Sequence, residues 1–188
     1  GERPDILMTV FEENLDEIAP LYEQVCQAND LMLLLNPVFE YNEVETGKGL
    51  SHKSFRVLRN WAKRPGVYLN EGFLKLREAG GNQRAAPVCK AGSSTVVISQ
   101  KNELVLPCYH LGMEYLPIDG NLEGLWRSDR VQQQIAQEGK HEACQGCVIN
   151  CYMQPSFAVE LNRYWWSALP STLKYNFEKG TWKQLFAR

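Results

Sequence analysis

The chain has no apolar run long enough to cross a membrane, and it has little net charge. Its 188 residues contain 20 basic and 22 acidic side chains, which give a formal charge of −2. No stretch approaches the roughly 20 consecutive apolar residues of a transmembrane helix. The first residues, GERPDILMTV, lack the apolar core and cleavage site of a secretory signal. Without a basic surface, nucleic acid is a poor partner, and we expect a soluble, cytoplasmic protein that does not bind it.

Internal repeats and low-complexity tracts are also absent, and the composition is that of a folded domain. Hydrophobic residues make up 44% of the chain and charged residues 22%, as in ordinary globular proteins. A chain of this length can bury enough apolar surface to fold without obligatory disulfides or metals. Its six cysteines therefore need another explanation.

The beginning of the chain alternates between strand and helix patterns. Residues 5–10 (DILMTV) and 31–39 (LMLLLNPVF) are apolar runs of strand length, and their continuous apolarity favours parallel strands covered on both faces. Apolar residues recur at helical spacing over 15–28 and 52–64. Ser51 is suited to cap the second of these helices. The order β-α-β-α predicts an α/β fold.

The composition changes near residue 82, where we place a domain boundary. A Gly-Gly-Asn sequence forms a flexible junction there, and cysteines, rare before it, become frequent. We expect three parts, which cover residues 1–81, 82–155 and 156–188. The third part is aromatic and basic, and we expect it to be a helical tail.

The middle part begins with a predicted β-hairpin. Apolar and β-branched runs at 95–99 and 104–106 are joined by a polar turn, in which Asn102 tolerates a left-handed conformation. After the hairpin, Asn121 is suited to cap a helix that ends near Gly139.

The spacing of the cysteines is the most informative pattern in the chain. Cys89 and Cys108 flank the predicted hairpin, and Cys144, Cys147 and Cys151 follow in the sequence CQGCVINC. A hairpin and a tight CxxC turn can present four thiolates to one site, which suits zinc or an iron–sulfur cluster. Disulfides are disfavoured because no secretory signal is found, and buried cysteines with no role beyond packing are a further alternative. A zinc ribbon is the main competitor, although zinc ribbons usually present two CxxC pairs.

The order of these motifs resembles the SPASM or twitch extension of radical SAM enzymes. Cys89-Lys-Ala-Gly, the sequence LPC at 106–108, DGNLEGLWRSDRV at 119–131 and the closing CQGC occur in the family's order. The segments TVFEENLDEI and LMLLLNP are similar to late strands of the radical SAM barrel. The resemblance implies late βα units of a partial TIM-like barrel, followed by a small α+β cluster-binding domain with a β-hairpin.

The chain departs from this family because the CxxxCxxC signature that cleaves S-adenosylmethionine is absent, and Cys26 is the only cysteine before Cys89. We expect the chain to be the C-terminal part of a longer enzyme, with an N-terminal barrel half as partner. S-adenosylmethionine and a second 4Fe–4S cluster belong to that whole enzyme. By resemblance, it would make a radical on a peptide, lipid or other small-molecule substrate.

The resemblance also implies one auxiliary 4Fe–4S cluster, held by four of the five clustered cysteines. Cys89, Cys108, Cys144 and Cys147 match the family's ligand order, and Cys151 is an alternative to one of the last two. Such a cluster transfers electrons or positions the substrate. The competing hypothesis is a non-catalytic zinc-binding module that recognises a partner protein through the aromatic C-terminal segment.

Other candidate side chains have simpler explanations beside the functional ones. His110 follows Cys108 closely, and we expect it to lie beside the site rather than to be a ligand. Asn36 and Phe39 end a strand, where α/β folds place ligand contacts, although an Asn-Pro turn explains them equally. A solvated loop is expected to hold three acidic residues that could otherwise bind a cation, Glu40, Glu43 and Glu45.

The aromatic residues of the second half leave two interpretations open. Trp126 is most simply part of a core over the hairpin. Trp165 and Trp166 have basic neighbours in Arg163, Lys174 and Lys179. This combination fits peripheral contact with a membrane or a cover over a hydrophobic substrate, and packing against the rest of the fold explains it equally.

Overall fold

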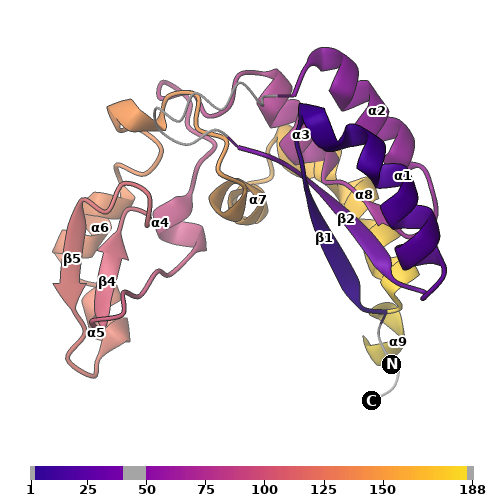
Figure 1. Cartoon of the computed structure of the whole chain (residues 1–188). Helices are drawn as coiled ribbons and strands as arrows, with labels where there is room; N and C mark the ends of the chain where they lie inside the picture. Colours follow the sequence, from indigo (N-terminus) through magenta and orange to yellow (C-terminus); the bar gives the residue numbers. More distant parts are fainter. Residues whose placement is uncertain (1–2, 40–49, 186–188) are drawn as a thin grey trace. The chain divides into compact units, whose positions relative to one another are not determined.

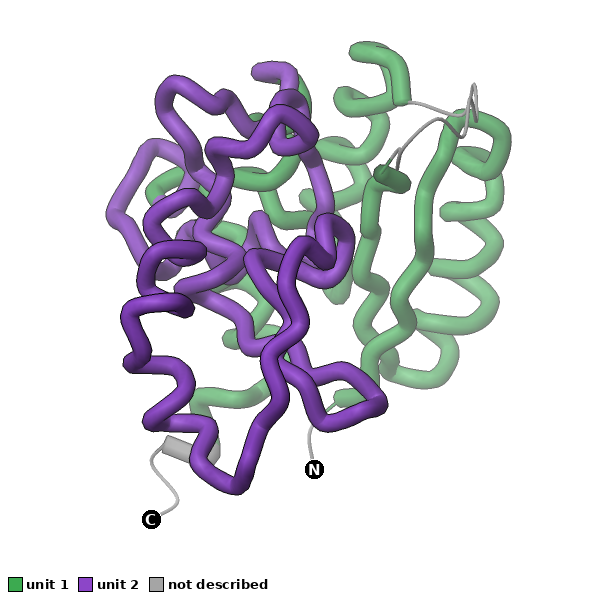
Figure 2. Tube along the Cα trace, turned by 90° about the vertical axis from the view of Figure 1, so that its left-hand side faces the viewer, with its two compact units in different colours: residues 1–78, 166–188 green, residues 79–165 purple. Residues whose placement is uncertain are grey.

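The structure is a computed structural model that describes residues 3–39 and 50–185. It divides into two compact units, coloured separately in Figure 2: unit 1 comprises residues 1–78 and 166–188, and unit 2 comprises residues 79–165. The boundaries expected from the sequence lie at residues 82 and 156. The chain therefore leaves unit 1 once and returns to it in the aromatic segment.

Unit 1 contains a parallel sheet with the strand order β1-β2-β3, and Figure 1 labels β1 and β2. β1 spans Asp5–Val10, β2 spans Met32–Pro37 and β3 spans Val67–Tyr68. Leu7 of β1 lies opposite Leu34 of β2. Both predicted strands are confirmed, and so is the α/β class. Within the described residues the sheet is open, and the partial barrel stays a prediction.

Helical segments connect the strands of unit 1. Between β1 and β2 the helix changes type along its length, as η1 (3-10, Glu12–Glu17), α1 (Ile18–Pro20) and η2 (π, Leu21–Gln27). Between β2 and β3 lies α2 (His52–Ala62), and α3 (Glu71–Glu78) follows β3. Ser51 caps α2 as predicted, because its hydroxyl accepts a hydrogen bond from the Ser54 N–H at 3.2 Å.

One apolar core joins the sheet to these helices. Its largest members come from β1, β2, the first helical connection, α2 and α3: Met8, Val10, Leu33, Leu35, Ile18, Tyr22, Phe55, Leu58 and Leu74. Complete burial of one such side chain contributes about 1.5–3 kcal/mol. This cluster is therefore the main source of stability in unit 1.

The C-terminal helices complete unit 1. α8 spans Arg163–Lys179 and α9 spans Trp182–Leu185. The ammonium of Lys174 donates to three carbonyls between α2 and β3, those of Ala62, Arg64 and Val67, at 2.8–2.9 Å. Tyr175 donates a hydrogen bond to Asp5 at 2.7 Å. From Trp166 onward, the aromatic tail is thus part of the first unit.

Unit 2 is built from short elements: α4 (Ala91–Ser94), β4 (Glu103–Leu106), β5 (Glu114–Pro117), α5 (Leu122–Trp126), α6 (Asp129–Ile135), η3 (Glu142–Cys144) and α7 (Asn150–Val159). The predicted partner of β4, residues 95–99, forms only a single bridge with it, between Ile98 and Leu104. Asn102 in the intervening turn is left-handed as predicted, with φ 60°. The main partner of β4 is instead β5, because Leu116 joins the buried leucines of β4 in one core.

The helix predicted after Asn121 is interrupted and forms α5 and α6. Asn121 caps α5 as predicted and accepts a hydrogen bond from the Gly124 N–H at 2.8 Å. The prediction of one continuous helix was wrong because Ser128 caps a second helix, accepting from Val131. Trp126 packs against the core of β4, β5 and α6, as expected.

Candidate metal centre

Three separate loops of unit 2 carry the clustered cysteines. Cys89 precedes α4, Cys108 lies between β4 and β5, and Cys144 and Cys147 form the turn before α7. All six cysteines of the chain are free thiols. Cys89, Cys108 and Cys144 are buried and Cys147 is partly buried. The fold therefore withdraws four thiols from solvent without joining them in disulfides.

These four thiols interact with one another electrostatically. The pKa of Cys89 is raised to about 12, chiefly by burial and also by negative charge on Cys147, Cys144 and Cys108. Burial likewise raises the pKa of the other three thiols, and the pKa of Cys144 and that of Cys147 respond to charge on Cys108. At neutral pH the thiols are protonated in the metal-free protein. A bound metal must displace their protons.

Backbone groups already point at the sulfurs. Hydrogen bonds from the backbone of Ala91 to Cys89, of Leu111 and His110 to Cys108, of His141 and Gly139 to Cys144, and of Ile149 to Cys147 lower the pKa of these thiols against the effect of burial. Hydrogen bonds to the ligand sulfurs are among the features that tune iron–sulfur clusters. These hydrogen bonds favour the thiolate form, whereas burial, which has the larger effect, favours the protonated thiol.

Asn82 ties the Cys89 loop to the CQGC turn. Its amide Nδ2 donates to the carbonyls of Gly139 and Cys144 at 2.8 and 3.0 Å. Its Oδ1 accepts from the N–H groups of Val88 and Cys89 at 2.9 and 3.0 Å. The side chain is completely buried, so these four bonds use its whole hydrogen-bonding capacity.

The backbone of the same residue pairs with the CQGC turn. The Asn82 N–H donates to the Cys147 carbonyl, and the Gly146 N–H donates to the Asn82 carbonyl, at 3.0 and 2.8 Å. Gly81 permits this approach, because a Cβ there would lie 2.3 Å from the Gly146 oxygen. The Gly-Gly-Asn sequence, interpreted from composition as a flexible junction, is thus a fixed part of the site.

Cys151 and Cys26 are placed differently from the other cysteines. Cys151 is exposed on the first turn of α7, although its pKa responds to charge on Cys108. Cys26 is completely buried in the core of unit 1. The structure therefore separates four enclosed thiols from a fifth that is adjacent and exposed.

The four thiols are suitable donors, although their present spacing does not form a coordination site. Soft thiolate donors suit zinc and iron–sulfur clusters. In the described residues, no group of three or more His, Cys, Asp or Glu side chains lies close enough to hold a single metal ion. A zinc ion requires each sulfur at about 2.3 Å, whereas the thiolates of a four-iron cluster bind different irons and stand further apart.

The remaining candidate residues from the sequence do not lie together: one belongs to unit 2, two belong to unit 1 and three lie outside the described residues. The His110 ring lies edge-on to Tyr109 and Tyr152, and burial lowers its pKa, so it is neutral at physiological pH. Asn36 and Phe39 belong to unit 1, at and after the end of β2. Glu40, Glu43 and Glu45 lie outside the described residues.

Two of the three basic residues named for the aromatic tail make their contacts within unit 1, whereas Arg163 lies in unit 2 and donates to the Tyr164 hydroxyl. Lys174 binds backbone carbonyls, as described above, and Lys179 pairs with Asp5. Trp166 is 59% exposed and Phe177 is 78% exposed. Among the described residues, no helix combines the length and apolarity that a membrane span requires.

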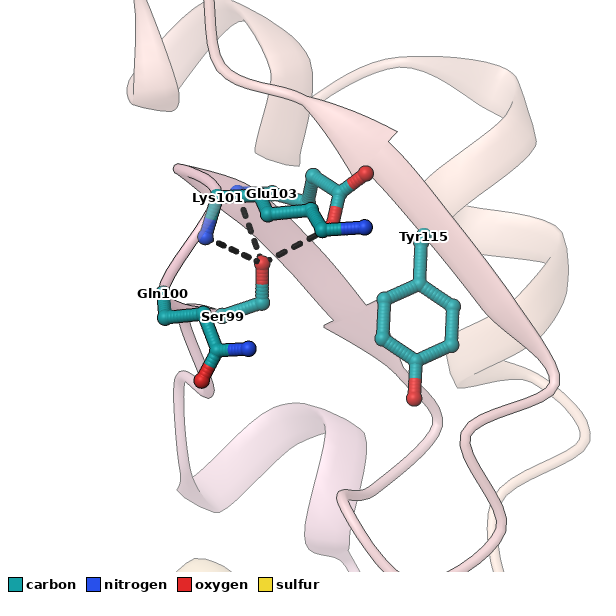
Figure 3. A pocket seen from close by; sticks show the side chains of 5 residues that line it. All are labelled: Ser99, Gln100, Lys101, Glu103 and Tyr115. Carbon is teal, nitrogen blue, oxygen red and sulfur yellow. Dashed lines mark hydrogen bonds between the residues drawn. The ribbon is translucent and has the colours of Figure 1, made fainter.

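A pocket of about 310 Å³ lies in unit 2, where residues 95–99 turn into β4 (Figure 3). Its lining residues are Ser99, Gln100, Lys101, Glu103 and Tyr115. The Ser99 hydroxyl accepts hydrogen bonds from the N–H groups of Lys101 and Glu103 at 3.1 and 3.3 Å, and donates to the Glu103 carboxylate at 2.8 Å. These groups stabilise the turn, and none of the clustered thiols lines the pocket.

Tyr152 and Ser156 were not singled out from the sequence, and neither was Asn82 as part of the site. Tyr152 accepts a hydrogen bond from the Tyr109 N–H at 3.0 Å, and Ser156 accepts one from the Lys90 N–H at 2.7 Å. A serine and a tyrosine one helical turn apart carry no signal that separates these contacts from ordinary packing.

Comparison of the chain with protein-family models, curated proteins and solved structures finds no match.

Proposed function

We propose that this chain is the C-terminal part of a radical SAM enzyme and that unit 2 binds one auxiliary 4Fe–4S cluster. The observation that carries the proposal is the enclosure of four free thiols from three loops of unit 2, Cys89, Cys108, Cys144 and Cys147. The motif order from Cys89 to the CQGC turn supports the family. In this proposal the parallel sheet of unit 1 is the late part of a partial barrel.

Cys151 is left out of the proposed ligand set. It is exposed, whereas Cys89, Cys108 and Cys144 are buried and Cys147 is partly buried. A cluster held by four thiolates has no open iron for a substrate, which favours a role in electron transfer or substrate positioning. When bound, the cluster supplies one-electron chemistry.

The residues of this chain provide the shell of that centre. Asn82 keeps two of the ligand loops at a fixed separation, and backbone groups donate hydrogen bonds toward the sulfurs. Burial excludes water from the thiols of Cys89, Cys108 and Cys144, and partial burial limits its access to Cys147. Exclusion of water and hydrogen bonds to sulfur are the two means by which a protein shell sets the potential of such a cluster.

S-adenosylmethionine cleavage and the radical step are proposed only for the whole enzyme. They would require the CxxxCxxC signature in an N-terminal barrel half, together with its own 4Fe–4S cluster. The substrate is a peptide, a lipid or another small molecule.

Metal and sulfide content test the proposal directly. Anaerobically purified protein should be brown and should hold about four iron and four sulfide per chain. A colourless protein with one zinc ion per chain would contradict the proposal and support the zinc-binding module. A Cys151→Ala variant with unchanged iron would support the ligand set named here.

A further inference from the structure

The helix that follows the CQGC turn contacts the loops of both other ligand cysteines. α7 spans Asn150–Val159 and begins three residues after Cys147. Tyr152 and Ser156 lie one turn apart on its buried face, where they are 5% and 0% exposed. The position of α7 is thus linked through a short peptide segment to that of the CQGC turn.

Each of the two hydroxyls binds the backbone directly after a ligand cysteine. The Tyr152 hydroxyl accepts a hydrogen bond from the N–H of Tyr109, the residue after Cys108, at 3.0 Å. The Ser156 hydroxyl accepts one from the N–H of Lys90, the residue after Cys89, at 2.7 Å. The same contact therefore occurs at both loops.

The two contacts are connected to each other. Ser156 donates its own hydroxyl hydrogen to the Tyr152 carbonyl, so its oxygen is oriented to accept from Lys90. The Tyr152 ring packs edge-on against His110, with ring centroids 5.7 Å apart. Side chains fixed in this way hold the peptide planes that follow the cysteines, and a fixed peptide plane directs the Cα–Cβ bond of the cysteine before it.

We propose that Tyr152 and Ser156 are positioning residues of the metal centre, which orient Cys108 and Cys89 toward the CQGC turn. This inference rests on the proposed function, because it assumes that the four thiols bind one centre. Outer-shell hydrogen bonds that orient ligands contribute about 10- to 100-fold to metal affinity. Here the orientation acts through the backbone, so loss of either hydroxyl leaves all four ligands in place and loosens one of them.

Hydroxyl deletions in the anaerobically purified full chain test the inference. Tyr152→Phe and Ser156→Ala should lose iron to a chelator about tenfold faster than wild type. They should also show a changed electron paramagnetic resonance spectrum and midpoint potential of the reduced cluster. Ser156→Thr, which restores the hydroxyl, should recover the wild-type values.

Matched controls come from unit 1. Tyr22 is 6% exposed and donates its hydroxyl hydrogen to the Pro65 carbonyl at 2.9 Å, and Ser54 is 1% exposed and bonds to Glu12. Tyr22→Phe and Ser54→Ala remove buried hydroxyls of the same kind away from the thiols. They should leave the spectrum, the potential and the rate of iron loss unchanged.

The outcomes separate this inference from the proposed function. Wild-type protein without iron and sulfide contradicts the proposed function, whatever the variants do. Wild-type values for iron loss, spectrum and potential in both Tyr152→Phe and Ser156→Ala overturn the positioning role alone. Loss of the metal-free fold in both variants, seen by circular dichroism, would show a structural role instead and would also overturn it.

Discussion

Unit 1 and unit 2 are stabilised by different kinds of contact. In unit 1 one apolar core joins the parallel sheet to the helices around it. In unit 2 the apolar cluster of Leu104, Leu106, Leu116 and Val131 joins β4 and β5 to α6, and α7 buries further apolar side chains such as those of Met153 and Phe157. The cysteine loops are joined, in addition, by hydrogen bonds of Asn82, Tyr152 and Ser156.

This difference has a physical consequence for folding. Apolar burial is non-directional and tolerates small shifts, so unit 1 can fold on its own side chains. A network of buried hydrogen bonds is stable only when every member is satisfied. Unit 2 should therefore depend more than unit 1 on single residues and on a bound metal.

Removal of one of the proposed ligand cysteines should change unit 2 more than any other substitution, and should leave unit 1 unaffected. Cys89→Ala should abolish stable binding of the cluster and loosen unit 2, because three thiolates leave one iron without its protein ligand. Cys26→Ala, in the core of unit 1, should keep the full iron content and lower stability by about 1 kcal/mol. Iron analysis measures cluster binding, and urea denaturation measures stability. Equal iron loss in both variants would contradict the assignment of Cys89 as a ligand.

Removal of Asn82 should be nearly as damaging. Asn82→Ala leaves two N–H groups and two carbonyls without their partner, and one unsatisfied buried group costs about 1–3 kcal/mol. We expect a loss of about 3 kcal/mol, confined to unit 2 in amide hydrogen exchange.

The matched control for Asn82 is Asn70, a buried asparagine of unit 1. The side chain of Asn70 accepts a hydrogen bond from the Phe73 N–H at 2.9 Å and also bonds to Tyr68. Asn70→Ala should cost only about 1 kcal/mol. A larger loss for Asn70→Ala than for Asn82→Ala would reverse the contrast between the units.

Alanine substitutions at two glycines of unit 2 distinguish the cost of a strained backbone conformation from the cost of a steric collision. Gly81 and Gly120 have φ values of 77° and 76°, but a Cβ at Gly120 would meet nothing within 4 Å. Gly120→Ala should therefore cost about 1–2 kcal/mol from its left-handed conformation alone. Gly81→Ala should cost more and also lower the iron content, because its Cβ would collide with the CQGC turn. Denaturation midpoints of the two variants provide the comparison.

The stability of the metal-free protein should fall as the pH rises above about 9. The pKa of Cys89 is raised from 9.0 to about 12 in the folded state, so its contribution is fully present below pH 9. Between these two values the unfolded chain ionises while the folded chain does not, which favours unfolding. Urea denaturation at several pH values should show this fall in wild type and a smaller fall in metal-free Cys89→Ala.

The smallest effect is expected at the exposed aromatic residues of α8. Phe177 is 78% exposed, so Phe177→Ser should change stability by no more than about 0.5 kcal/mol. Sedimentation with anionic lipid vesicles tests membrane contact, one of the interpretations that the sequence leaves open for the aromatic tail. Vesicle binding that is lost in Phe177→Ser would support that contact, whereas absence of binding in wild type would remove it.

Local patterns were sufficient to predict β1, β2 and α2 of unit 1, whereas β3 and α3 were not predicted. The apolar runs at 5–10 and 31–39 identify β1 and β2, and Ser51 marks the start of α2. These features depend on spacing and capping within one segment, which a single sequence contains. The grouping of the cysteines could also be anticipated, because their spacing is unusual.

The remaining features depend on contacts between distant residues. The pairing of β4 with β5 is decided by Leu116 and the core it joins. Asn82 binds groups more than 50 positions away in sequence, at Gly139 and Cys144. Ser128 was the exception, because its capping position before Asp129 is a local signal that could have predicted the start of α6.

The return of α8 to unit 1 makes unit 2 an insertion. Lys75 and Glu71 of α3 bond to Ser167 and Ser171 of α8, so the two helices run antiparallel where the chain leaves and re-enters. A short linker from Glu78 to Trp166 could therefore close the gap. The sheet would then keep its own closing helix without any cysteine-bearing loop, and such a shortened chain should fold as unit 1 alone.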